Sequence, residues 1–257
     1  MKREKKVFGV VNQKGGVGKT AVSVNLSAAI AMADANTLLV DCDSQANATS
    51  GLGINPEKTI YEALLELDKV SPEEFIYSTK VDRLKIIPSK RDLAGAEIEL
   101  VGQDNREKKL KKVLERVKEN FEFIFIDCPP SLGLLTVNSL FASDYIIIPI
   151  VCEYYPLEGI AYLMKTIELV KSSKSDIEIF GVIVNMFDPR PLLYQEVLSE
   201  INKYFGSKVF NTKIPRNVKI AEAPSYGKSV IEYEPRSKGA QAFVELAREF
   251  LERVKKL

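Results

Sequence analysis

The sequence has no histidine, and its three cysteines, Cys42, Cys128 and Cys152, stand far apart without a C-x-x-C pair. Zinc and iron–sulfur centres need histidine or cysteine ligands at characteristic spacings, so the sequence argues against both kinds of site. Each cysteine falls in or beside an apolar run that reads as the end of a buried strand. We therefore expect three reduced thiols that serve as small core residues of a cytosolic protein.

The sequence also lacks an excess of one charge and any long apolar run. Its 257 residues include 36 basic and 35 acidic ones, so net charge alone gives no argument for nucleic acid or membrane. The apolar run after the charged segment Met1–Lys6 is too short for a signal peptide, and no stretch approaches a spanning helix. We expect a cytoplasmic protein. No repeat, low-complexity tract or linker divides residues 1–257, which are expected to form one domain.

The most informative segment reads K-G-G-V-G-K-T from Lys14 to Thr20. An apolar run, Val7–Val11, precedes it and a helical pattern, Ala21–Ala33, follows it, so the glycines lie at a strand-to-helix turn where backbone N–H groups can converge on phosphate. Lys19 is placed to neutralise the β- and γ-phosphates, and the Thr20 hydroxyl to ligate Mg²⁺. The usual first glycine is missing and a second lysine, Lys14, is present, which defines the deviant form of the phosphate-binding loop.

Short apolar runs alternate with helical patterns along the chain. The expected strands are Val7–Val11, Thr37–Val40, Leu84–Ile87, Phe123–Ile126, Tyr145–Ile150 and Ile177–Val184. The expected helices are Val22–Ala33, Ile60–Leu67, Glu107–Glu119, Gly159–Val170, Leu192–Phe205 and Gly239–Lys256. Because the strands are almost continuously apolar, we predict an α/β fold with a mostly parallel twisted sheet and helices on both faces, as in P-loop NTPases.

Carboxylates follow two of the expected strands. Asp41 and Asp43 come after Thr37–Val40, and Asp127 comes directly after Phe123–Ile126. Ligands of open α/β sheets bind at the carboxyl ends of strands, where such side chains gather. An aspartate after an apolar strand is typical of a carboxylate that holds Mg²⁺ through its water shell, the role expected for Asp127. Asp43 is the candidate for orienting an attacking water, whereas Asp41 either contacts the metal or caps the following turn.

Six sequence blocks, taken together, resemble the ParA/Soj ATPases of chromosome and plasmid partitioning. These ATPases belong to the deviant Walker A group, which also contains MinD and the nitrogenase iron protein. The blocks span essentially the whole chain: K-G-G-V-G-K-T at 14–20, D-C-D-S-Q-A-N-A-T-S-G-L at 41–52, D-C-P-P-S-L-G at 127–133, I-P-R-N-V at 214–218, E-A-P-S-Y-G-K at 222–228 and Y-E-P-R-S-K-G-A at 233–240.

The resemblance implies an ATP hydrolase that is slow without a partner and in which two subunits sandwich two ATP molecules. Lys14 would reach the partner's nucleotide and act in catalysis together with Asp43. Thr20 would ligate Mg²⁺, and Asp43 and Asp127 would hold it through water. The expected ATP-binding residues are Lys14, Gly15, Gly16, Val17, Gly18, Lys19, Thr20, Ala21 and, around the adenine, Asn185, Pro215, Arg216 and Asn217.

For the adenine segment the residues allow two readings. Pro215 cannot donate a hydrogen bond and fixes the chain direction, while Asn217 can offer a donor and an acceptor to a base edge. The alternative is that Pro215, Arg216 and Asn217 form only a turn after a short strand.

The resemblance further implies that the ATP-bound homodimer binds double-stranded DNA without sequence preference, on the nucleoid, and that a ParB-type centromere-binding protein stimulates hydrolysis. From Lys203 onward there are 12 basic and 6 acidic residues, which suits phosphate contacts. A second basic cluster runs from Arg106 to Lys112. The candidate DNA-binding residues are Lys203, Lys213, Arg216, Lys219, Lys228, Arg236 and Lys238.

Three positions depart from the family pattern. Ala21 stands where a second threonine is usual, Ser44 replaces a proline, and Ala46 replaces a glycine. Alanine disfavours a positive φ, so a turn that needs one at position 46 would be strained. These changes bear on turnover rate more than on the type of reaction.

Two other functions are alternatives to partitioning. A MinD-like membrane-surface switch would need Ala242–Leu257 as an interfacial helix. We expect no stable membrane association. Glu245, Glu249 and Glu252 suit anionic lipid poorly, so a helix docked on the core is favoured. A redox ATPase would need paired cysteines for a cluster, and Cys128 and Cys152 lack that context.

Overall fold

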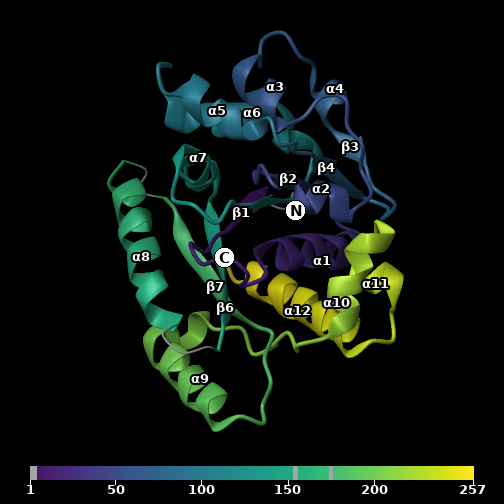
Figure 1. Cartoon of the computed structure of the whole chain (residues 1–257), viewed down its shortest axis with the longest axis vertical. Helices are drawn as coiled ribbons and strands as arrows, with labels where there is room; N and C mark the ends of the chain where they lie inside the picture. The colour runs from purple at the N-terminus through teal and green to yellow at the C-terminus, as the bar shows by residue number, and fades with distance from the viewer. Residues whose placement is uncertain (1–4, 153–155, 174–175) are drawn as a thin grey trace.

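The structure is a computed structural model that describes residues 5–152, 156–173 and 176–257. Within these residues seven strands form one sheet in the order β3-β4-β2-β5-β1-β6-β7 (Figure 1). Six of them are parallel and were expected from the sequence; the two-residue edge strand β3, antiparallel to β4, was not. The strands are β1 Lys6–Val10, β2 Thr37–Asp41, β3 Tyr77–Ser78, β4 Leu84–Ile87, β5 Phe123–Asp127, β6 Tyr145–Val151 and β7 Glu178–Asn185.

Helices cover both faces of the sheet, as predicted (Figure 1). All six expected helices are present; α9 has the predicted bounds, and each of the other five is shifted at one end or both. The helices α5 and α7 and several one-turn helices were not expected from the sequence. The helices are α1 Lys19–Met32, α2 Asn47–Gly51, α3 Ile60–Leu65, α4 Pro72–Phe75, α5 Leu93–Leu100, α6 Lys109–Val117, α7 Leu134–Ala142, α8 Pro156–Ser173, α9 Leu192–Phe205, α10 Val218–Glu222, α11 Val230–Tyr233 and α12 Lys238–Val254.

Side chains that alternate along each strand divide the core into two layers. Val7 of β1 packs in the layer under α3 and α5 to α9, while Phe8 packs in the layer under α1, α11 and α12. Leu38 and Leu39 of β2 divide in the same way. Strands such as β1 and β2 are therefore apolar at successive positions because both of their faces are covered, which explains the continuous apolar runs of the sequence.

The C-terminal helix α12 packs against α1 and covers one face of the sheet. Phe243, Leu246 and Phe250 are fully buried, and Phe250 lies 4.8 Å from Phe8 and 5.0 Å from Phe180 between ring centroids. The apolar side of α12 thus forms core, as favoured over an interfacial helix. No helix in the part of the chain that the structure describes is long and apolar enough to cross a membrane.

Replacing Phe250 with alanine should lower the free energy of unfolding by roughly 3–5 kcal/mol, because it leaves a cavity among packed aromatic rings. Urea denaturation followed by circular dichroism would measure the change. Val244→Ala on the same helix is the matched control, since Val244 is 43% exposed and should change stability by less than about 0.5 kcal/mol. Equal losses in the two variants would show that α12 is not docked through Phe250.

Candidate functional site

The phosphate-binding loop connects the end of β1 to the start of α1. Gly16 and Gly18 have φ of 75° and 85°, a left-handed conformation that favours glycine. The loop wraps back so that the Lys19 Nζ lies 3.4 Å from the Lys14 carbonyl oxygen. A Cβ added at Gly15 or Gly16 would meet no atom within 4 Å, so this side of the loop is open to a ligand.

Two asparagines outside the glycine run hold this loop. Asn12 donates to the Pro149 carbonyl at 2.7 Å and accepts from the Lys14 amide at 2.9 Å. Asn185, at the end of β7, donates to the Val17 carbonyl at 2.8 Å. The sequence placed Asn185 at the adenine; in the structure its side chain contacts the phosphate-binding loop. Asn12 was missed; its signal was an amide side chain two residues before Lys14.

Asp127 lies at the end of β5 with its carboxylate fully buried. Its Oδ1 accepts a hydrogen bond from the Ser23 hydroxyl of α1 at 3.0 Å. Among the described residues no donor meets hydrogen-bond geometry at its buried Oδ2. Burial, and then the neighbouring carboxylate of Asp41, raise the pKa of Asp127 to about 8, although the nearby Thr20 hydroxyl, like that of Ser23, acts to lower it. A buried carboxylate oxygen without a donor is what a cation with its water shell would satisfy.

Lys19 supplies positive charge beside this carboxylate. Its side chain is buried, and burial lowers its pKa, while the charges of Asp127, Cys128 and Asp43 oppose that change. Thr20 follows it in the first turn of α1. The loop therefore places a buried cation, a hydroxyl and a buried carboxylate together, which is the set expected from the sequence.

Asp41, the last residue of β2, and Asp43, two residues further on, have different environments. Asp41 accepts through Oδ2 from the Thr49 amide at 2.9 Å and the Thr49 hydroxyl at 2.7 Å, and burial raises its pKa to about 6. Asp41 therefore caps the turn and the start of α2. Turn capping was one of the two roles that the sequence allowed for it; the other was contact with a metal ion. Asp43 is 8% exposed and accepts from the Gln45 amide at 2.9 Å through Oδ1.

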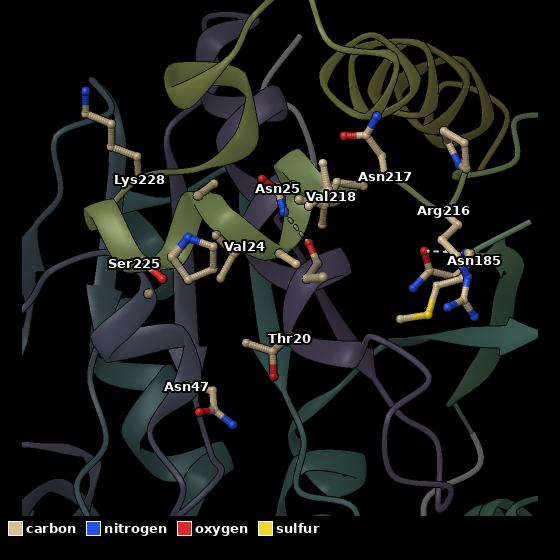
Figure 2. A pocket seen from close by; sticks show the side chains of 18 of the residues that line it. Thr20, Val24, Asn25, Asn47, Asn185, Arg216, Asn217, Val218, Ser225 and Lys228 are labelled. Carbon is tan, nitrogen blue, oxygen red and sulfur yellow. Dashed lines mark hydrogen bonds between the residues drawn. The ribbon is translucent and has the colours of Figure 1, made fainter.

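A cavity of about 770 Å³ adjoins the loop. Figure 2 shows Thr20, Asn185, Arg216 and Asn217 in its wall, and Ala21 and Pro215 line it too. The structure therefore brings the predicted adenine residues to one cavity beside the start of α1. Asn217 is already used in part, since its Oδ1 accepts from the Lys219 amide at 3.0 Å and caps α10. Its amide nitrogen is the group left to read a base.

The Pro215–Asn217 segment is held by backbone hydrogen bonds to a distant part of the chain. The Phe187 amide donates to the Ile214 carbonyl at 2.9 Å, and the Arg216 amide donates to the Phe187 carbonyl at 3.4 Å. The segment is thereby attached to the chain that leaves β7 after Asn185. Met186, next in the chain, has a φ of 52°, a strained conformation of the kind found at ligand sites.

Known proteins resemble this chain over nearly its whole length. A family model described as an AAA domain matches residues 5–179. The sporulation initiation inhibitor protein Soj of Bacillus subtilis is 51% identical over 248 residues, which are 95% of this chain and 97% of that protein. The chain belongs to the Soj/ParA family of chromosome-partitioning ATPases. The chromosome partitioning protein ParA of Myxococcus xanthus is 46% identical over 252 residues, 96% of this chain and 88% of that one.

Solved structures share the fold of this Soj/ParA-family protein. A crystal structure of cobyrinic acid a,c-diamide synthase from Mycobacterium smegmatis, with a bound ATP analogue and magnesium, has a TM-score of 0.85. It is 32% identical and covers 98% of this chain and 96% of its own.

The departure at Ala46 has a structural consequence. Ala46 adopts φ 53° and ψ 37°, the left-handed conformation that the usual glycine would take without strain. This conformation costs about 1–2 kcal/mol for an L-residue. Hydrogen bonds from Ser50 to the Ala46 carbonyl, by its amide and by its hydroxyl, hold the turn in place.

The candidate DNA-binding residues of this Soj/ParA-family protein lie on several elements. Lys203 is exposed on α9, Arg236 and Lys238 are exposed at the start of α12, and Arg216 is exposed at the cavity. The remaining three have contacts of their own. Lys219 pairs with Glu222 at 2.8 Å, and Lys213 donates to the Asn211 carbonyl at 2.9 Å. Lys228 lines the cavity of about 770 Å³, which we call the nucleoside-sized cavity.

Replacing Gly18 with alanine should weaken ATP binding at least about tenfold. The left-handed φ alone costs about 1–2 kcal/mol for an alanine, and the new Cβ would lie 2.1 Å from the Asn185 Nδ2. Binding of a fluorescent ATP analogue would measure the loss, with circular dichroism to verify folding. In the control Gly102→Ala the Cβ meets nothing within 4 Å, so binding should be unchanged. Parent-like affinity in Gly18→Ala would mean that this loop conformation is not the binding one.

Proposed function

We propose that this protein is an ATP-dependent dimerising ATPase of chromosome or plasmid partitioning, with a single ATPase domain over residues 1–257. The observation that carries the proposal is the meeting of Lys19, Thr20, Asp43 and Asp127 at the phosphate-binding loop, beside a cavity of nucleoside size. The 51% identity to Soj over 95% of the chain supports the same reaction and biological role.

ATP lies with its triphosphate on the loop and its nucleoside in the cavity. Backbone N–H groups from Gly15 to Ala21 bind phosphate oxygens at the positive end of α1, and the buried Lys19 neutralises the β- and γ-phosphates. Asn185 and the Pro215–Asn217 segment bind the adenine, and Arg216 stands at the cavity wall. Ala21 contributes its backbone amide only, because it lacks the hydroxyl of the usual threonine.

The residues present fit a Mg²⁺ ion. Thr20 offers a hydroxyl oxygen, and the unsatisfied buried Oδ2 of Asp127 offers the acceptor that a metal-bound water needs. Asp43 completes the set from the neighbouring strand end. When bound, Mg²⁺ would offset the negative charge that ATP brings close to Asp127.

Hydrolysis needs an aligned water and positive charge on the transferring oxygens. Asp43 orients that water, since it is nearly buried and its Oδ1 is fixed by the Gln45 amide. Lys14 is exposed at the open side of the loop, where it reaches the nucleotide of a second subunit. No arginine finger is evident in the loop motifs, so turnover is slow until a partner acts.

Dimerisation then raises the affinity for DNA. Two subunits double the number of basic side chains presented to phosphates, which raises avidity without any new contact. The exposed residues Lys203, Arg236 and Lys238 are the most accessible of the candidates. A ParB-type partner stimulates hydrolysis, and ADP-bound monomers leave the nucleoid. The protein works in the cytoplasm.

Binding to random-sequence duplex DNA, at low and moderate salt with ATP, ADP or no nucleotide, tests this function. Asp43→Ala should bind DNA with ATP at least as tightly as the parent, because it dimerises and cannot hydrolyse. Affinity should fall steeply as salt rises. Lys14→Ala should still bind ATP yet remain monomeric by light scattering, and its DNA affinity should stay at the ADP level.

The matched control for Lys14→Ala is Lys19→Ala, which should lose ATP binding itself. ATP-dependent dimers of Lys14→Ala, as stable as those of the parent, would refute the role of Lys14 across the interface. DNA affinity that does not depend on nucleotide, or ATP-dependent attachment to anionic liposomes instead, would refute the partitioning function.

A further inference from the structure

The nucleotide site leaves one strongly basic element unexplained. The segment from Arg106 to Asn120, which contains α6, has seven basic and three acidic residues. Lys108, Lys111, Lys112 and Lys118 are exposed along it at spacings that keep them near one stripe of the helix. The opposite side of α6 is core, with the buried residues Leu110, Val113, Leu114 and Val117.

Two adjoining hollows, of about 340 and 120 Å³, lie along this stripe and share Lys111 and Glu115 in their walls. We call them together the α6 groove. Apolar side chains from α7 and the sheet form part of its walls. Its lining residues are Lys108, Lys111, Lys112, Glu115, Phe141 and Ser173 in the larger hollow and Lys5, Lys6, Val7, Lys111, Leu114, Glu115, Lys118, Ile124, Ala142 and Asp144 in the smaller one.

The four lysines of the stripe on α6 are poorly neutralised, whereas Lys5 at the smaller hollow pairs with Glu119. Among the described residues, no ion pair or hydrogen bond involves the ammonium group of Lys111, Lys112 or Lys118, and that of Lys108 lies 3.8 Å from Glu107. Other cations of the segment do have close partners: Arg116 pairs with Asp68 at 2.9 Å. Like charges crowded on one stripe repel one another, and an anionic ligand would relieve that repulsion.

We propose that the α6 groove docks an acidic amphipathic segment of a partner protein. Carboxylates of that segment pair with Lys111, Lys112 and Lys118, while its apolar side chains enter the hollows beside Phe141 and Leu114. Such a segment matches both the charge and the apolar lining, as helix-in-groove recognition requires.

The lining favours protein over nucleic acid. Hollows of this size suit single side chains, whereas duplex DNA presents phosphates that cannot fill apolar recesses. Glu115 stands between the two hollows and Asp144 lines the smaller one, and both carboxylates would repel a phosphate backbone. None of the described residues lines both the α6 groove and the nucleoside-sized cavity, so docking and ATP binding are compatible.

The α6 groove is also lined by α7, a helix that begins at the end of the sheet where Asp127 lies. Phe141 and Ala142 belong to the last turn of α7, which packs on α6. The first turn of α7 follows the Cys128–Gly133 loop after Asp127, and Glu97 of α5 accepts from its Leu135 amide at 3.1 Å. A docked segment would thus contact the last turn of α7, the helix whose first turn follows Asp127 and the Cys128–Gly133 loop.

Fluorescence anisotropy with the full chain and a labelled synthetic amphipathic peptide, built from leucine, phenylalanine, aspartate and glutamate, tests the proposal. The peptide should bind saturably, and Lys111→Glu/Lys112→Glu should weaken it about tenfold. The double variant Lys255→Glu/Lys256→Glu makes the same change of charge outside the groove and should leave affinity unchanged. ATP hydrolysis should be the same in all three proteins.

Two altered peptides separate docking from simple charge attraction. A peptide with its carboxylates changed to amides and one with its apolar residues changed to serine should both lose affinity. If the serine peptide binds as well as the original, the groove is only a basic surface and the proposal is wrong. Equal binding by Lys111→Glu/Lys112→Glu and the parent would also overturn it. A third outcome would overturn the proposal as well: random-sequence duplex DNA competes with the peptide and binds Lys111→Glu/Lys112→Glu more weakly than the parent. The surface would then bind nucleic acid.

Discussion

The structure depends on one electrostatic constraint, the burial of the Asp127 carboxylate at the centre of the sheet. β5 lies between β1 and β2, so Asp127 is paired in register with Val10 and Asp41 and is removed from water. Burial of an ionised carboxylate is costly unless cations or donors compensate. Ser23 supplies one donor and Lys19 a nearby charge, yet Oδ2 stays without a donor among the described residues. This incomplete compensation makes the end of the sheet a site for a cation and a phosphate ester.

Much of the fold could be read from the sequence because the core has two faces. Strands such as β5 are apolar at every position before the final Asp127, and the glycines before Lys19 suit a tight strand-to-helix turn. The antiparallel strand β3 has two residues, too few for any periodic signal, and α5 and α7 were missed where short helices follow loops. Ser23 escaped notice because its partner Asp127 lies 104 residues away, and the Pro149 partner of Asn12 lies 137 residues away, so no local pattern shows either contact.

The two readings of Asp41 show where sequence alone stops. A carboxylate after a buried strand suits a metal or a turn equally, and only the hydrogen bonds from Thr49 decide that Asp41 caps α2. Ala46 shows the converse: alanine disfavours a positive φ, yet position 46 adopts the left-handed conformation. Tertiary contacts around α2 outweigh the local preference. The α6 groove is a third case, since the lysines are visible in sequence and the apolar hollows beside them are not.

The central claim is that Asp127 completes a Mg²⁺–ATP site, and ligand-dependent unfolding tests it most directly. Urea unfolding of the parent and of Asp127→Asn would be compared without ligand, with ATP and EDTA, and with ATP and Mg²⁺. At a hundredfold excess of ligand over its Kd, bound ATP with Mg²⁺ should stabilise the parent by about 2.7 kcal/mol. Most of that gain should disappear with EDTA, and in Asp127→Asn the two ATP conditions should differ little. Equal dependence on Mg²⁺ in the two proteins would contradict the account, because the buried carboxylate would then have no part in holding the metal.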